Sequence, residues 1–230
     1  MNNSFRHEQK YICSLKQLEA LKEVLSSVMS CDRFASDQGY LVSSLYFDTQ
    51  NDRFLSESIN GFSYRQKYRI RSYNGDTEKL KLECKEAFFH MKRKKFISLK
   101  IGDAERLIAG EICKNTDIFE GFNYLKKTEL LQPKIVINYN RRAFVDPDFN
   151  IRITLDQNIN VSDDVDSFLK SQNLFQPAMD SHFGILEVKF DTFLPGYIKE
   201  ILKFEDLEQK SFSKYAAGRV ALDSSLNYLK

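Results

Sequence analysis

The chain has 230 residues, of which 42% are hydrophobic and 29% are charged; this balance is typical of globular proteins and excludes a disordered or fibrous chain. No run approaches the ~18 consecutive apolar residues that a membrane-spanning helix needs, and the N-terminus, Met1-Asn2-Asn3-Ser4, lacks the apolar core of a secretory signal. The four cysteines show neither metal-ligand nor paired spacing, so we expect reduced thiols in a cytoplasmic protein. They are Cys13, Cys31, Cys84 and Cys113.

The predicted elements begin with a strand over Arg6–Ile12 and an amphipathic helix over 15–29, which Ser14 and Gln17 open as a capping box. Along the rest of the chain we expect, in order, a strand at Leu41–Asp48, a short helix at Gln50–Ile59, strands at Phe62–Tyr73, Lys79–Ala87 and Lys92–Leu99, a short helix capped by Asp103, a helix at Ile118–Leu131, strands at Lys134–Phe144, Asn150–Asp156 and Ile185–Phe190, a helix opened by Pro195 and a last helix after Ser213.

Consecutive strands dominate this order, and hairpin-length connections such as Asn74-Gly75-Asp76 join them. The pattern predicts an α+β fold with a largely antiparallel sheet and helices packed outside it. Because no segment resembles a linker, we expect one domain over residues 1–230. The polar stretch Asn158–Ser181 is the expected long mobile loop.

The net charge of +2 conceals an asymmetry. Between Arg65 and Lys95 there are eleven basic and four acidic residues, so this segment carries +7 and the rest of the chain carries −5. A concentrated positive region in an otherwise acidic molecule focuses the electric field and attracts anions. The charge pattern therefore predicts an anionic ligand.

Alternation along the strands places many of these charges on a single face. That face carries Arg65, Lys67, Arg69, Arg71, Lys79, Lys81, Glu83, Lys85, Lys92, Lys94, Arg152, Thr154, Asp156, Glu187 and Lys189. The alternative is an ordinary solvated face, but solvated faces usually mix signs because like charges on opposing strands destabilise a sheet. If the sheet closes, this face lines a barrel, which would be unfavourable without a polyanionic ligand.

Two acidic residues lie among these cations. Glu8 stands between Arg6 and Lys10, and Glu187 stands beside Lys189. A carboxylate among phosphate-binding cations can hold Mg²⁺ or Mn²⁺, which prefer oxygen ligands and bridge phosphate oxygens. The alternative is that each carboxylate only forms an ion pair with its neighbouring lysine.

Seven short motifs follow one another along the chain. They are Arg6-His-Glu-Gln-Lys10-Tyr11, Tyr68-Arg-Ile-Arg71, Leu82-Glu-Cys-Lys85, Tyr139-Asn-Arg141-Arg-Ala-Phe144, Arg152-Ile-Thr-Leu-Asp156, Leu186-Glu-Val-Lys189 and Phe212-Ser-Lys214-Tyr215. In this order they resemble the VTC domain, the polyphosphate polymerase branch of the triphosphate tunnel metalloenzymes, in a stand-alone form like that of bacterial members. The resemblance implies an antiparallel β-barrel that forms a basic-lined tunnel with helices outside, which agrees with the cationic face that strand alternation predicts.

The resemblance also implies roles for individual residues. Catalytic phosphate contacts are expected from Lys10, Arg69, Arg71, Lys85, Arg141, Arg152 and Lys214. Substrate binding is expected of Tyr139, whose hydroxyl would donate a hydrogen bond, and of Lys92, Lys94 and Arg6. Strand alternation adds Lys81 and Lys189 to the expected substrate-binding residues. Glu187 would be the metal ligand, with Glu8 beside it. The wider superfamily opens with two alternating glutamates, and Arg6 replaces the first of them here, which exchanges a metal ligand for a phosphate contact.

The leading hypothesis is a metal-dependent polyphosphate polymerase that transfers the terminal phosphate of ATP to a growing polyphosphate chain, with Mn²⁺ or Mg²⁺ as cofactor. Phosphoryl transfer needs positioning and electrostatic stabilisation more than a protein nucleophile. One alternative is a tripolyphosphatase or nucleoside triphosphatase, and another is a non-catalytic module that binds polyphosphate or RNA. Nucleic acid is not the expected partner, because Tyr64, Tyr68 and Tyr73 fall largely on the face opposite the arginines and the pI of about 8.2 is modest. Any membrane recruitment would need a partner protein.

Overall fold

The computed structural model describes residues 5–32, 39–89, 91–112, 117–170, 174–204 and 207–223. Its strands are β1 (Arg6–Ser14), β2 (Ser30–Cys31), β3 (Tyr40–Asp48), β4 (Tyr64–Tyr73), β5 (Leu80–Phe88), β6 (Met91–Leu99), β7 (Gln132–Asp146), β8 (Ile151–Ser162), β9 (Gln176–Pro177) and β10 (Phe183–Phe190). Its helices are α1 (Leu15–Val28), α2 (Arg53–Ile59), α3 (Ile101–Ile108), α4 (Asp117–Glu129), the 3-10 helix η1 (Phe168–Lys170), α5 (Gly196–Phe204) and α6 (Lys214–Leu222).

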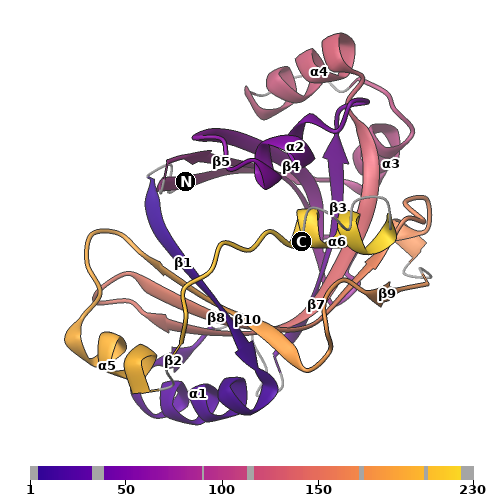
Figure 1. Cartoon of the computed structure of the whole chain (residues 1–230). Coiled ribbons are helices and arrows are strands. Elements are labelled where there is room, and N and C mark those ends of the chain that lie inside the picture. The colour runs from indigo at the N-terminus through magenta and orange to yellow at the C-terminus, as the bar shows by residue number, and fades with distance from the viewer. Residues whose placement is uncertain are drawn as a thin grey trace.

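The strands from β7 round to β8 in the sheet order form a closed antiparallel ring (Figure 1). The sheet order is β2-β7-β3-β4-β5-β6-β1-β10-β8-β9, and the additional pairing of β7 with β8 joins the two sides of the sheet. The predicted antiparallel barrel in an α+β fold is therefore confirmed. Strand alternation now has a spatial meaning, because one face of each strand points into the ring and the other points outward.

Helices α1, α3 and α4 cover the outer face with apolar side chains. The capping box at Ser14 and Gln17 opens α1 as predicted, and α1 buries Leu18, Leu21 and Leu25 against outward side chains of β1, β8 and β10. On the opposite side of the ring, α3 and α4 belong to a second apolar cluster that includes outward side chains of β4 and β5. Because the apolar side chains of each strand point outward and are buried under the helices, the alternating polar side chains point into the ring.

The seam between β1 and β6 is short. Among the described residues, only Arg6–Lys92 and His7–Met91 pair across it, whereas eight residue pairs join β1 to β10. Further along β1 the C-terminal segment takes over, because the Lys210 N–H donates to the Lys10 carbonyl at 2.9 Å and Tyr11 forms a β-bridge with Gln209. Residues near the C-terminus therefore pair with β1 beyond the point where its described pairing with β6 ends.

Helix α6 follows this segment and lies against the inner side of β7 and β8. A Cβ added at Gly218 would approach the side chains of Ile135, Val161 and Ile137 at 3.1–3.2 Å. Ile135 and Ile137 alternate in phase with Tyr139, whose hydroxyl contacts Arg71 inside the ring. The helix therefore occupies the end of the interior where β7 begins, so the expectation that the helices pack outside the barrel is wrong for α6.

Two local expectations were wrong. The stretch Asn158–Ser181 is not one long loop, because β8 continues to Ser162 and the described residues after it include η1 and β9. A bulge shifts the β7–β8 register near Asn158, whose φ is 53°, so the polar asparagines stay in the strand while Ile159 and Val161 are buried. Asp103 lies in the first turn of α3 and does not cap it, since Lys100 holds the cap position.

Other chemical expectations concern cysteines and membranes. Within the part of the chain that the structure describes, Cys13, Cys31 and Cys84 form no disulfide, and Cys113 lies outside that part. None of the described helices combines the length and the hydropathy that crossing a bilayer would require.

Candidate active site

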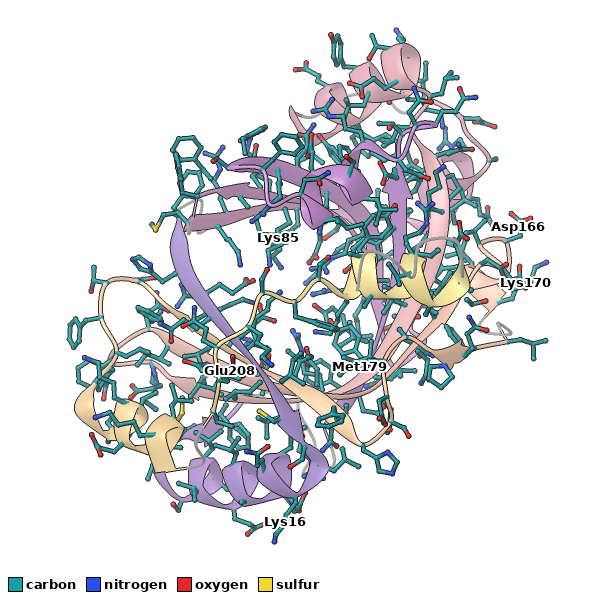
Figure 2. All side chains as sticks on the ribbon, viewed as in Figure 1. Lys16, Lys85, Asp166, Lys170, Met179 and Glu208 are labelled. Atoms are coloured by element: carbon teal, nitrogen blue, oxygen red, sulfur yellow. The ribbon has the colours of Figure 1, made fainter. Side chains whose placement is uncertain are left out.

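The inner face of β4 and β5 brings like charges opposite one another. Arg71 pairs with Lys81 and Lys67 pairs with Lys85 across the two strands, while Arg69 faces Glu83. Lys85 lies on the inner side of the ring (Figure 2). Because cross-strand cations repel, this wall needs anions. Glu83 and Glu8 supply them, and a third group of carboxylates pairs with cations elsewhere in the interior.

The first group surrounds Glu83, whose side chain is fully buried. Arg69 Nε donates to Glu83 Oε2 at 2.8 Å, and Lys94 Nζ donates to Oε1 at 2.9 Å. Arg71 Nη1 lies 3.7 Å from the same carboxylate. Burial alone would raise the pKa of Glu83, but Arg71, Arg69 and Lys94 hold it well below its usual value. This glutamate is therefore an anion among cations, and not a proton donor.

The second group surrounds Glu8. Lys85 Nζ donates to both of its oxygens, at 2.8 and 3.0 Å, and Lys92 Nζ donates at 2.8 Å. Lys10 lies at 3.4 Å and Lys189 at 4.0 Å. Burial opposes ionisation, and Glu187 does too, yet the lysines lower the pKa of Glu8. Burial lowers the pKa of Lys85 well below its usual value, and Lys10 adds to this by repulsion.

The third group joins the last helix to the barrel. Arg141 donates to the two oxygens of Asp156 at 2.6 and 2.7 Å, and Lys214 at the start of α6 lies 2.7 Å from Asp156. Arg141 also lies 3.7 Å from Glu187, which pairs with Lys189 at 2.9 Å. A bidentate guanidinium–carboxylate pair fixes the direction of the arginine as well as its charge.

Tyrosines connect the groups. Arg71 Nη2 donates to the Tyr139 hydroxyl at 3.4 Å, and Lys214 Nζ lies 4.8 Å from the centroid of the Tyr139 ring. Arg69 Nη1 donates to the Tyr46 hydroxyl at 2.8 Å. Burial raises the pKa of Tyr46, but Arg69 and Arg71 more than offset it, so that the pKa is lowered. Tyr139 thus stands between residues from the middle and the end of the chain, and its hydroxyl accepts a hydrogen bond from Arg71; its predicted role as a donor to substrate stays a prediction.

Three predicted residues lie apart from these groups. Arg6 pairs with Asp191 at 2.7 Å and donates to the Asn150 carbonyl. Arg152 pairs with Asp32 at 2.6 Å and donates to the Tyr40 hydroxyl at 3.1 Å. Lys81 lies over the rings of Tyr73 and Phe96. The other predicted cations come together in the interior.

The interior also contains residues that the sequence did not single out as site residues. Glu83 forms an ion pair with Arg69 and Asp156 forms one with Arg141. The Tyr46 hydroxyl accepts a hydrogen bond from Arg69. Lys67 Nζ donates to the Ser213 hydroxyl at 2.8 Å, and burial together with repulsion from Lys10 and Arg65 lowers its pKa to about 7. Alternation placed Lys67, Glu83 and Asp156 on the correct face, but only the register shows which cations each one touches.

Glu8 and Glu187 are the carboxylates predicted to bind a metal ion. Glu8 pairs with Lys189, and Lys10 pairs with Glu187, so the two glutamates are diagonal neighbours on one face of β1 and β10. The described residues contain no group of three or more His, Cys, Asp or Glu side chains suited to hold a metal ion. Mg²⁺ is usually held by one or two carboxylates together with substrate phosphates. The pair therefore fits a divalent ion shared with phosphate, and does not form a cage of protein ligands.

Comparisons with known proteins agree with the barrel fold. A candidate adenylate cyclase from Bacillus halodurans has a similar structure, with a TM-score of 0.58, 14% identity, and coverage of 93% of this chain and 96% of that chain. A second, from Vibrio parahaemolyticus, has a TM-score of 0.51, 11% identity, and coverage of 94% and 98%. These likenesses show the fold alone, and no curated protein matches the sequence. The model of the VTC domain family matches residues 5–222. Since that match spans nearly the whole chain, the chain belongs to the VTC domain family.

Proposed function

We propose that the protein is a metal-dependent polyphosphate polymerase. In the proposed reaction the terminal oxygen of a polyphosphate chain attacks the γ-phosphorus of ATP, the bond from that phosphorus to the β–γ bridging oxygen breaks, and ADP leaves. Family membership and the cationic interior support a triphosphate substrate. The transfer to polyphosphate, rather than to water, is the part that the experiment below tests.

One observation carries the proposal. Lys10, Arg71 and Lys214 come from the start, the middle and the end of the chain, yet each lies in the interior beside a buried carboxylate. Cations outnumber carboxylates in this interior, and the ion pairs keep the side chains ordered. A phosphate chain can take over these contacts because its oxygens accept the same hydrogen bonds.

The residues divide the work by their chemistry. Arg69, Arg71 and Arg141 present planar forks that match phosphoryl oxygens in a bidentate way, whereas Lys10 and Lys85 act as movable point charges. We infer that these groups bind and align the triphosphate and stabilise the charge that develops on the transferred phosphoryl group. Glu8 and Glu187 would hold Mn²⁺ or Mg²⁺, which when bound bridges phosphate oxygens and neutralises their charge.

The same proposal covers the setting of the reaction. ATP and inorganic polyphosphate are the proposed partners, and nucleic acid is not one. We place the protein in the cytoplasm, where ATP is available and unpaired thiols stay reduced, with any recruitment to a membrane mediated by a partner protein.

The test is incubation with ATP and Mn²⁺, followed by a gel that separates polyphosphate from free phosphate. We expect a ladder of polyphosphate that disappears when EDTA removes the metal. Free phosphate without a ladder would indicate a tripolyphosphatase or nucleoside triphosphatase. Neither product would indicate a non-catalytic binding module. Lys16→Ala is the control, because Lys16 is an exposed lysine on the outer helix α1 (Figure 2).

A further inference from the structure

Aromatic side chains gather around the cations at one end of the inner face. Tyr40 and Tyr73 meet edge to face with ring centroids 5.7 Å apart. Lys81 Nζ lies 5.8 Å from the centroid of Tyr73 and 5.2 Å from that of Phe96. The Arg71 guanidinium lies 5.9 Å from the Tyr73 centroid. Lys94 Nζ lies 5.4 Å from the Phe96 centroid. Three rings and three cations therefore lie together here, and they combine flat apolar surface with positive charge.

The end of the inner face that carries Tyr40, Tyr73 and Phe96 lies opposite α6. The inward positions of β4 run from Lys67 through Arg69 and Arg71 to Tyr73, a distance of about 20 Å along the strand. Lys67 bonds Ser213, the cap of α6, so Tyr73 marks the other end. Tyr73 and Phe96 are partly exposed, whereas Arg71 and Glu83 are buried. The rings are thus accessible at the point where the row of phosphate-binding cations begins.

Lys81 differs from the cations deeper in the row. Arg69 and Lys85 each contact a buried carboxylate. By contrast, no carboxylate among the described residues lies within 4.0 Å of the Lys81 ammonium, which rests on π faces instead. Such a cation keeps its charge available for an anion, and the rings beside it offer a surface for stacking. A nucleotide carries both complementary parts, a phosphate and a stacking base.

We propose that this end of the inner face binds the base of a nucleoside triphosphate. The base stacks on Tyr73 and Phe96, Lys81 binds the phosphate nearest the ribose, and the remaining phosphates extend inward onto Arg71 and Arg69. This inference rests on the proposed triphosphate site and deepens it, because it gives the substrate a direction and separates a nucleotide donor from inorganic tripolyphosphate. If the rings serve only to hold Lys81, the two ligands should respond alike to their removal.

Isothermal titration in the presence of Mg²⁺ provides the test, with the β,γ-imido analogue of ATP and inorganic tripolyphosphate as probes. We expect Tyr73→Ala to weaken the nucleotide at least about fivefold, the effect of losing one aromatic platform, and to change tripolyphosphate binding less than about twofold. Tyr73→Phe keeps the ring and should bind both probes like the wild type. Phe96→Leu preserves apolar bulk and should repeat the selective loss. Phe88→Leu is the control, because Phe88 is an exposed ring on the outer face of β5.

Equal weakening of both probes by Tyr73→Ala and Phe96→Leu, or no change with either variant, would overturn the inference. The outcome is separable from that of the polymerase assay. A wild type that makes polyphosphate, with variants that bind both probes normally, removes only the base site. Selective loss of nucleotide binding without any polyphosphate product keeps the base site and removes the polymerase.

Discussion

Glu83 holds Arg69, Arg71 and Lys94 together on the inner face, and Glu83→Gln removes the charge they share. Breaking a buried ion pair on one side costs about 3–5 kcal/mol, so we expect a lower melting temperature. Tripolyphosphate should then stabilise the variant more than the wild type, because the ligand replaces the missing anion. Thermal unfolding with and without the ligand measures this. Glu86→Gln, on the outer face beside Arg93, should show the wild-type ligand response; an equal response of the Glu83 variant would mean that its cations do not meet the ligand.

Lys67 makes the free energy of unfolding depend on pH. Its pKa is lowered from 10.5 to about 7 by burial and by repulsion from Lys10. Between these two pH values the unfolded chain binds a proton at this lysine that the folded chain does not, so the free energy of unfolding rises with pH across this window. Lys67→Met should remove this contribution and flatten the rise. Denaturant unfolding at pH 7, 8.5 and 10 compares the two proteins, and parallel curves would contradict the lowered pKa.

A change at Glu187, the proposed metal ligand, tests whether metal binding can be separated from phosphate binding. Glu187→Gln keeps the shape of the side chain and removes its charge. We expect metal-dependent turnover to fall roughly 10²-fold or more, on the scale of losing one transition-state contact. Binding of tripolyphosphate in EDTA should be retained, because a carboxylate has been removed from a cationic surface. Titration in EDTA and turnover with added Mn²⁺ measure the two effects; unchanged turnover at low metal would make Glu187 only the ion-pair partner of Lys189.

At the scale of elements, the approach of β10 to its neighbours depends on Gly184. A Cβ there would meet the backbone oxygen of Asp156 at 2.6 Å and the Leu18 side chain at 2.5 Å. Gly184→Ala must therefore displace the strand that carries Asp156, and overpacking of this kind costs about 1–3 kcal/mol. We expect a lower melting temperature and weaker tripolyphosphate binding. Gly102→Ala in α3 is the control, since its Cβ meets nothing within 4 Å, and it should leave both properties intact.

Elements were predictable where one local signal determined them. The capping box at Ser14 and the period-two pattern of β4 involve only neighbours in sequence, and both are confirmed. The end of β8 was not predictable, because Asn158 and Asn160 remain in the strand through a bulge that depends on pairing with β7. Polarity alone predicts a loop for such a segment.

At the scale of the whole molecule, the asymmetry of charge predicted an anion site on β4, β5 and β6. The opposing wall on β1, β8 and β10 was predicted partly through the family resemblance. Which carboxylate holds which cation depends on the register around the closed ring, as the shared contacts of Glu8 with Lys85 and Lys92 illustrate. No short-range pattern specifies such contacts, because the strands concerned lie far apart in sequence. The single domain over residues 1–230 stays a prediction.

The proposed ligand contacts span the chain, and this gives a prediction for the stability of the whole molecule. Tripolyphosphate would bind Lys10 on β1, Arg71 on β4 and Lys214 on α6 together, so unfolding would release it. A ligand at a hundred times its Kd adds about 2.7 kcal/mol, which for a chain of this size corresponds to a rise in melting temperature of about 5–10 °C. Arg71→Lys keeps the charge and loses the fork, so at the same ligand concentration its rise should be smaller. Lys16→Ala on the outer helix should keep the full rise. Thermal unfolding at constant ionic strength decides, and an Arg71→Lys variant that responds like the wild type would show that the bidentate contact assigned to Arg71 does not form.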